Sequence, residues 1–115
     1  MSLKIVFMGT SEFSIPTLDI LKKNKFNIIT AYTQPPQKSK RGQKINPSAI
    51  EDYCKKNGIN FRNPPSLSNK EELENFKELF PDVVVVVSYG QIIPKNFLKI
   101  AKFGFINIHA SLLPK

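Results

Sequence analysis

One histidine and one asparagine are the residues of this sequence best suited to chemistry. His109 is the sole histidine among the 115 residues, and it follows the apolar segment 105–108. Because side chains alternate along a strand, Asn107 and His109 are expected on the same side. A carboxamide there could stabilise the oxyanion of a tetrahedral intermediate while the imidazole moves a proton, as acyl transfer requires. A structural histidine and a capping asparagine would give the same pattern.

Other catalytic and cofactor motifs are missing from the sequence. The turn after the first apolar segment, M-G-T-S at residues 8–11, has neither the dinucleotide fingerprint nor the phosphate loop of nucleotide-binding proteins. The sequence has no G-x-S-x-G elbow and no spacing of metal ligands, so no metal is expected. Any catalysis therefore depends on His109.

Positive charge is concentrated in one acid-free stretch of the sequence. The net charge is +8, and residues 20–50 contribute +7 through Lys22, Lys23, Lys25, Lys38, Lys40, Arg41 and Lys44. A surface that faces phosphate groups needs such a concentration. Lysine enrichment without a function is the alternative, because only Arg41 and Arg62 are arginines among the 17 basic residues.

The fold that must position these residues alternates strands and helices. Apolar runs predict strands at residues 3–8, 27–32, 59–61, 83–87 and 105–108. The run 83–87 is continuously apolar, which is typical of a strand covered on both faces of a parallel sheet. With right-handed crossovers, this order predicts one α/β domain with a doubly wound, mostly parallel, Rossmann-like sheet. Ligands would bind beyond the carboxyl ends of its strands.

Helices and loops follow from apolar spacing, caps and breakers. A capping box at Ser68 and Glu71 opens one helix, and Gly58 ends another. Residues 33–47 hold three prolines and Gly42, which predicts a long loop that can hold no regular element for long. Four helices are predicted from these apolar groups: Ile15, Leu18 and Leu21; Ile50, Tyr53 and Cys54; Leu73, Phe76, Leu79 and Phe80; Phe97, Leu98 and Ala101.

The sequence predicts a cytoplasmic protein. Its longest aliphatic run is the five valines at 83–87, far shorter than a membrane-spanning helix. The apolar run near the amino terminus is too brief for a secretory signal. Cys54 is the single cysteine, so it can close no disulfide within the chain, and it is interpreted as a small buried residue.

The phrase I-N-I-H-A-S-L-L-P at residues 106–114 resembles the N-x-H-x-S-L-L-P signature of the folate-dependent formyltransferases. The resemblance extends to M-G-T-S-E-F at 8–13, T-Q-P-P at 33–36 and S-Y-G-Q-I-I-P at 88–94. It implies formyl transfer from 10-formyltetrahydrofolate to an amine, with Asn107 and His109 catalytic. It also implies that the folate is bound by Gln91, Ile92, Ile93, Ser111, Leu112, Leu113 and Pro114. Ser11 and Ala110 depart from the family's frequent proline and glycine.

The long loop at residues 33–47 is informative about the amine that accepts the formyl group. R-G-Q-K at 41–44 and the following N-P-S are similar to the insertion with which one branch of the family meets the acceptor arm of methionyl initiator tRNA. The resemblance therefore implies that Lys38, Lys40, Arg41 and Lys44 bind tRNA. A formyltransferase for a small amine or amino sugar nucleotide, and a noncatalytic nucleic-acid-binding module, remain alternatives.

The resemblance also implies how much of the family's machinery this sequence holds. The family's aspartate partner of the histidine and its carboxy-terminal tRNA-binding barrel have no match here. Residues 1–115 are therefore expected to be the amino-terminal part of the catalytic domain, with a sheet incomplete at its carboxy terminus. Alone they are expected to be inactive, and the full-length protein is expected to be a monomer.

Overall fold

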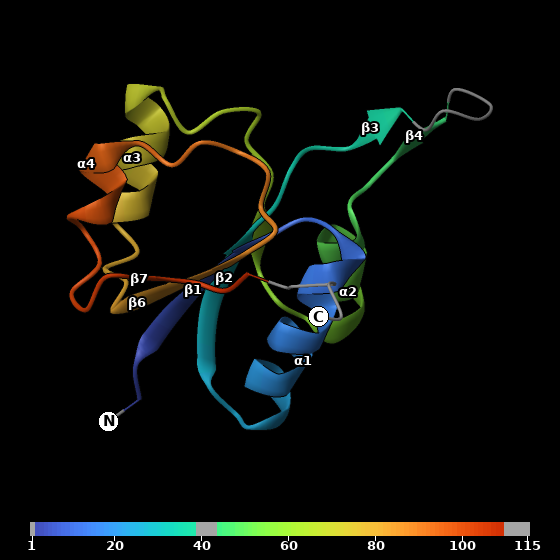
Figure 1. Ribbon diagram of the computed structural model, residues 1–115, viewed down its shortest axis with the longest axis horizontal. Helices are drawn as coiled ribbons and strands as arrows, with labels where there is room; N and C mark the ends of the chain where they lie inside the picture. Colours follow the sequence, from blue (N-terminus) through green and yellow to red (C-terminus); the bar gives the residue numbers. More distant parts are fainter. Residues whose placement is uncertain (1, 39–43, 110–115) are drawn as a thin grey trace, which may run out of the picture.

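A five-stranded parallel sheet forms the centre of the molecule (Figure 1). The computed structural model describes residues 2–38 and 44–109. Neighbouring strands pair in parallel in the order β5-β2-β1-β6-β7, which confirms the predicted doubly wound α/β sheet. The strands are β1 (Lys4–Gly9), β2 (Asn27–Tyr32), β5 (Phe61–Arg62), β6 (Val83–Val87) and β7 (Phe105–Asn107).

The two middle strands, β1 and β6, are apolar on both faces. Every residue of β6 is buried, as is every residue of β1 after Lys4. Alternate side chains enter two separate core clusters, so that Val84 and Val86 lie on one face while Val83, Val85 and Val87 lie on the other. The continuously apolar run therefore marks a central strand, as predicted.

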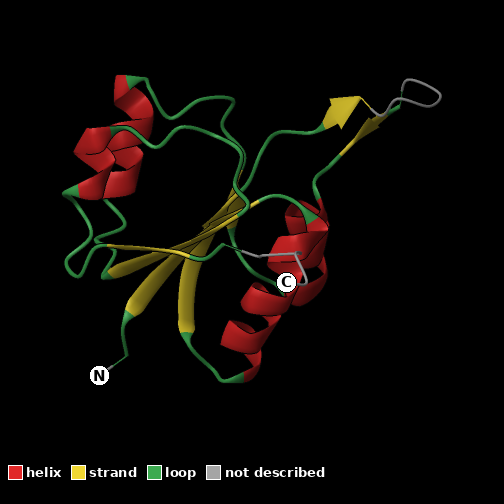
Figure 2. Cartoon of the chain, viewed as in Figure 1, coloured by secondary structure: helices red, strands yellow, loops and turns green. Residues whose placement is uncertain are grey.

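Helices cover both faces of the sheet (Figure 2). On one face lie α1 (Ile15–Lys23), preceded by the short 3₁₀ turn η1 (Glu12–Ser14), and α2 (Ala49–Asn57). On the other lie α3 (Lys70–Lys77) and α4 (Lys95–Leu98), joined by the stacked rings of Phe76 and Phe97 at 4.8 Å. No helix in residues 2–38 and 44–109 is long and apolar enough to cross a membrane.

The helix boundaries differ from those predicted. Asn69, not Ser68, caps α3, because its side chain accepts from the Glu72 backbone N–H at 2.8 Å while Ser68 bonds to Ser66. Phe80 lies outside the helix, 71% exposed and with a φ of 49°. Pro81 follows it, and the helical conformation is disfavoured for a residue that precedes proline. Likewise α4 ends at Leu98 rather than near residue 101.

The predicted loop 33–47 contains a short hairpin. β3 (Gln37–Lys38) pairs antiparallel with β4 (Ile45–Asn46), and Figure 1 shows both strands reaching away from the main sheet. The prolines at 35, 36 and 47 flank these pairs, so they remove no hydrogen bond from the ladder. Each of the two strands is two residues long, so the prediction that no regular element extends far in this loop is confirmed.

The order of strands reverses between β1 and β6. From β1 the chain continues outward through β2 and β5, and after β6 it continues in the other direction to β7. Such a switch point leaves a crevice at the carboxyl ends of the two middle strands, where doubly wound proteins bind their ligands. In this molecule the crevice begins at Thr10, after β1, and at Ser88, after β6.

Candidate functional site

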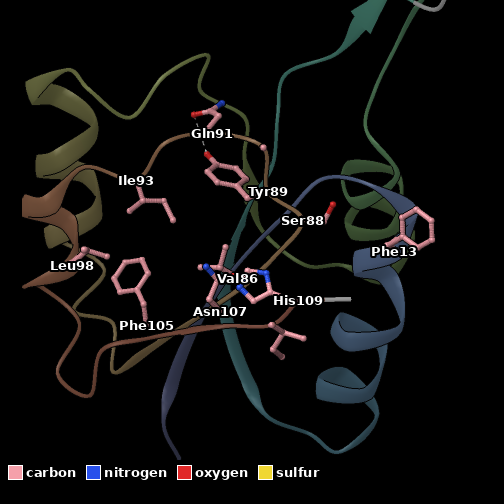
Figure 3. Close-up of a pocket in the computed structure, with 12 residues that line it drawn as sticks. Phe13, Val86, Ser88, Tyr89, Gln91, Ile93, Leu98, Phe105, Asn107 and His109 are labelled. Carbon is pink, nitrogen blue, oxygen red and sulfur yellow. Dashed lines mark hydrogen bonds between the residues drawn. The ribbon is translucent and has the colours of Figure 1, made fainter. Parts of the chain in front are cut away.

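A cavity of about 550 Å³ lies at the carboxyl ends of β6 and β7 (Figure 3). Its apolar wall consists of Val86, Ile93, Leu98 and Phe105, and its polar groups come from residues 88–91 and 107–109. The cavity thus combines an apolar wall with polar side chains, as small-molecule sites do.

Asn107 and His109 both line this cavity. Asn107 is the last residue of β7, where it pairs with Val86, and the Ile108 backbone N–H still donates to the Val86 carbonyl at 2.8 Å. The sheet therefore fixes the backbone up to the residue before His109. Both side chains are exposed to solvent, so that a ligand in the cavity could reach them.

The loop after β6 forms the opposite wall. Tyr89 is buried, and its hydroxyl donates to Gln91 Oε1 at 3.4 Å, the dashed line in Figure 3. Burial raises the pKa of the Tyr89 phenol, which therefore stays a neutral donor. Gln91 Nε2 donates to Gln34 Oε1 and to the Pro64 carbonyl, each at 2.9 Å. The Gln91 side chain is thus occupied within the protein.

The other predicted folate residues have different positions. Ile93 lines the cavity, whereas Ile92 is 89% exposed and lines a neighbouring hollow of about 430 Å³ with Leu67 and Pro94. Ser111, Leu112, Leu113 and Pro114 lie outside the described residues. Of the three predicted folate residues that the structure describes, Gln91 and Ile93 therefore line the cavity that holds Asn107.

A second cavity, of about 560 Å³, adjoins the first. It lies between the turn after β1 and the base of the β3–β4 hairpin, with Thr10, Gln34 and Asn46 in its lining. The two cavities share Phe13 and residues 88–90. A reaction between two ligands, one in each cavity, would therefore take place beside this common wall.

A model of the family described as formyl transferase matches residues 3–115. The chain belongs to the formyl transferase family. This confirms the resemblance found in the sequence.

Several relatives of this formyl transferase chain carry the name methionyl-tRNA formyltransferase. The Pelagibacter ubique protein (strain HTCC1062) is 56% identical over 116 residues, which cover all of this chain and 37% of the relative. The Clostridium novyi protein (strain NT) is 45% identical over 98% of this chain and 37% of its own length. The Coxiella burnetii protein (strain RSA 331 / Henzerling II) is 44% identical over all of this chain. The chain thus spans a little over a third of the length of these relatives.

In this formyl transferase chain, the basic side chains of the acid-free stretch 20–50 lie in different places. Lys38 and Lys44 are exposed at the β3–β4 hairpin, and Lys40 and Arg41 lie outside the described residues. Lys22 and Lys23 are in the last turn of α1, where Lys23 pairs with Asp19 at 3.0 Å and both suit the helix dipole. The acid-free stretch is therefore not one patch. No cluster of three potential metal ligands occurs among the described residues.

The sequence did not single out Gln34, Phe13, Ser88 and Tyr89 as formyl transferase site residues, although all four line a cavity. They lie within the phrases at 8–13, 33–36 and 88–94 that carried the resemblance. Those phrases follow β1, β2 and β6, so their shared position at strand ends is the signal that could have identified them.

Proposed function

We propose that this chain takes part in transferring a formyl group from 10-formyltetrahydrofolate to the amino group of methionyl initiator tRNA. One observation carries the proposal: Asn107 and His109 line one cavity at the carboxyl ends of β6 and β7 in a formyl transferase chain. The names of its relatives support the acceptor. With these substrates the reaction belongs to the cytoplasm.

The proposed chemistry is an acyl transfer with two assigned roles. The amine nitrogen attacks the formyl carbon, and the carbonyl oxygen becomes an oxyanion to which the Asn107 carboxamide donates. His109 accepts the proton that the amine loses and returns it to N10 of the folate. The carbon–N10 bond then breaks, which leaves a formylated amine and tetrahydrofolate. His109 is the imidazole that residues 1–115 offer for this proton transfer.

The folate donor would occupy the cavity that contains Asn107. Its apolar wall of Ile93, Leu98 and Phe105 suits a flat heterocycle. Gln91 and Ile93 line this cavity and Ile92 lines the neighbouring hollow, and together with residues 111–114 they are the proposed folate contacts.

The tRNA acceptor would approach from the hairpin side. The hairpin carries Lys38 and Lys44, and its base lines the second cavity, which shares a wall with the first. Lys40 and Arg41, which connect the two strands in the sequence, complete the proposed phosphate contacts. A 3′-terminal methionine could thereby reach the common wall while the tRNA backbone stays at the hairpin.

A transfer assay tests the proposal. The full-length protein that contains this sequence should move label from formyl-labelled 10-formyltetrahydrofolate to methionyl initiator tRNA. It should leave N-acetylmethionyl tRNA unlabelled, because that acceptor has no free amine. If the label appeared in a small amine or amino sugar nucleotide and not in the tRNA, that small molecule would be the acceptor instead of the tRNA. Residues 1–115 alone should be inactive, because catalysis by a set of residues collapses when one is missing.

A further inference from the structure

Gln34 joins the loops that follow several strands of the sheet. It lies between β2 and the β3–β4 hairpin, and its backbone N–H donates to Thr10 Oγ1 at 3.2 Å. The Thr10 hydroxyl in turn donates to the Tyr89 carbonyl at 2.6 Å. The carboxyl ends of β1, β2 and β6 therefore meet at the Gln34 backbone.

The Gln34 side chain makes a second set of links, to the turn at residues 88–91. Its Nε2 donates to the Gly90 carbonyl at 2.9 Å, and its Oε1 accepts from Gln91 Nε2 at 2.9 Å. Since Gln91 Nε2 also donates to the Pro64 carbonyl, the segment after β5 joins the same network. Both ends of the Gln34 carboxamide are thus used, and reversing it would place an oxygen against a carbonyl.

The turn that Gln34 holds has an unfavourable backbone conformation. Ser88 has a φ of 53°, which is costly for a residue with a side chain, and it is held by Thr10 N–H and the Ser11 hydroxyl, whereas Gly90 has a φ of 88°, which glycine adopts readily. Such conformations persist where surrounding contacts enforce them. A Cβ built on Gly90 would lie 2.8 Å from Gln34 Nε2, so the glycine also leaves room for the carboxamide.

This turn lines the cavity that holds Asn107 and is the wall shared with the second cavity. We propose that Gln34 is a positioning residue for the formyl donor: its carboxamide holds residues 88–91 in the shape that the donor cavity requires. The inference rests on the proposed function. Gln34 itself lines the second cavity and not the first, so it acts on the donor through the turn.

Hydrogen exchange of the full-length protein without ligand tests the structural half. In Gln34→Ala the backbone amide of Thr10, which donates to the Ser88 carbonyl of the turn at 3.0 Å, should exchange at least about tenfold faster than in the wild type, because the turn loses the two hydrogen bonds of the Gln34 side chain. Gln34→Glu keeps the size of the side chain but sets a carboxylate oxygen against the Gly90 carbonyl. It should therefore lose the same protection from exchange without the empty space that Gln34→Ala leaves. Asn57→Ala is the control, because it too loses a 2.9 Å amide-to-carbonyl bond, far from the turn.

Donor kinetics test the functional half. The KM for 10-formyltetrahydrofolate should rise about 5- to 30-fold in both Gln34 variants, the range expected from one or two lost hydrogen bonds, while kcat changes less. Combining Gln34→Ala with Gln91→Ala should cost less than the sum of the single effects, because both remove the same bond.

The two proposals fail in different ways. A wild-type protein that transfers no formyl group contradicts the proposed function, whatever the exchange rates of the turn. Transfer that is intact in the wild type, with exchange and donor KM of Gln34→Ala and Gln34→Glu equal to those of Asn57→Ala, overturns the role of Gln34. Faster exchange with an unchanged donor KM overturns it as well, because the turn would then not position the donor.

Discussion

At the scale of single residues, Asn107 and His109 are close in sequence and share one cavity wall, but their proposed roles are distinct. The carboxamide of Asn107 offers a neutral donor at the end of β7, and it matters most when negative charge develops on the carbonyl oxygen. The imidazole of His109 can accept and return a proton within the same reaction. Substitutions should therefore separate the two functions.

Asn107→Ala should lower the transfer rate of the full-length protein by about a hundredfold to a thousandfold, the usual effect of removing one oxyanion donor. Donor affinity should change little, because the missing bond matters mainly in the transition state. Steady-state kinetics and folate binding, measured on the same variant, give the two numbers. Asn60→Ala, an exposed asparagine outside both cavities, is the control. An unchanged rate with weaker folate binding would make Asn107 a binding residue.

Sequence reasoning could find Asn107 and His109 but not Gln34. A lone histidine two residues after an asparagine, directly beyond an apolar run, is visible in the sequence itself. Gln34 has no such local signal, because its partners Gly90 and Gln91 lie 56 and 57 positions away. The same holds for Ser88, whose left-handed backbone is set by its surroundings and not by its residue type.

At the scale of elements, the sequence predicted the type and order of every strand of the main sheet because each has its own apolar run. It located boundaries less well. β5 occupies residues 61–62 instead of 59–61, since pairing with β2 at Ala31 and Tyr32 defines the strand. The hairpin within 33–47 escaped prediction because its strands are two residues long and exposed, and so show no apolar pattern.

The capping of α3 can be tested by paired substitutions. Asn69→Ala should lower the free energy of unfolding by about 1 kcal/mol, because the Glu72 backbone N–H loses its side-chain acceptor. Ser68→Ala should cost less, since its hydroxyl bonds to exposed Ser66 and caps nothing. Denaturant unfolding of the two variants measures the difference. A larger loss of unfolding free energy in Ser68→Ala than in Asn69→Ala would instead support the capping box predicted at Ser68.

The β3–β4 hairpin should govern tRNA affinity without affecting the folate. Replacing Lys38, Lys40, Arg41 and Lys44 by Ser in the full-length protein should raise the KM for tRNA and leave donor binding unchanged. If all four cations contact phosphate, the logarithmic salt slope of tRNA binding should fall by at most about 3 to 4 units. Arg41→Lys should remain impaired although the charge is kept, because only the guanidinium can pair bidentately or stack.

The three lysines near the end of α1 provide a control from the same acid-free stretch. Lys22, Lys23 and Lys25 lie at or just beyond the last turn of α1, and the hairpin lies past the other end of the sheet (Figure 1). Their replacement by Ser should leave the salt slope unchanged. If the hairpin substitutions and the α1 substitutions had equal effects, the hairpin would contribute to tRNA binding only through its general positive charge.

At the scale of the whole molecule, the chain folds around two apolar clusters, one on each face of the sheet, and each cluster buries aromatic side chains. Tyr32 and Tyr89 belong to the cluster under α3 and α4. Tyr53 belongs to the margin of the other cluster, under α1 and α2, and its hydroxyl donates to Asp19 Oδ1 at 2.6 Å. The three tyrosines of the sequence therefore report on both layers.

Alkaline pH should unfold the chain and ionise its tyrosines together. Burial raises the pKa of Tyr32 to about 12, and burial with the bond to Asp19 raises that of Tyr53 to about 12. Burial raises the pKa of Tyr89 as well. The unfolded state, with ordinary pKa values near 10, then binds fewer protons than the folded one, so stability is full below about pH 10 and falls as the pH rises toward 12.

In a preparation of residues 1–115, tyrosinate absorbance can follow this transition cleanly, because these residues include no tryptophan. The absorbance should stay low at pH 10 and then rise together with the loss of helical circular dichroism. Tyr53→Phe should remove about a third of the change while leaving the other two tyrosines coupled to unfolding. Tyrosinate formation at pH 10 in a chain that keeps its circular dichroism would contradict the buried positions, and Tyr53→Phe would reveal whether Tyr53, the most accessible of the three, is the residue responsible.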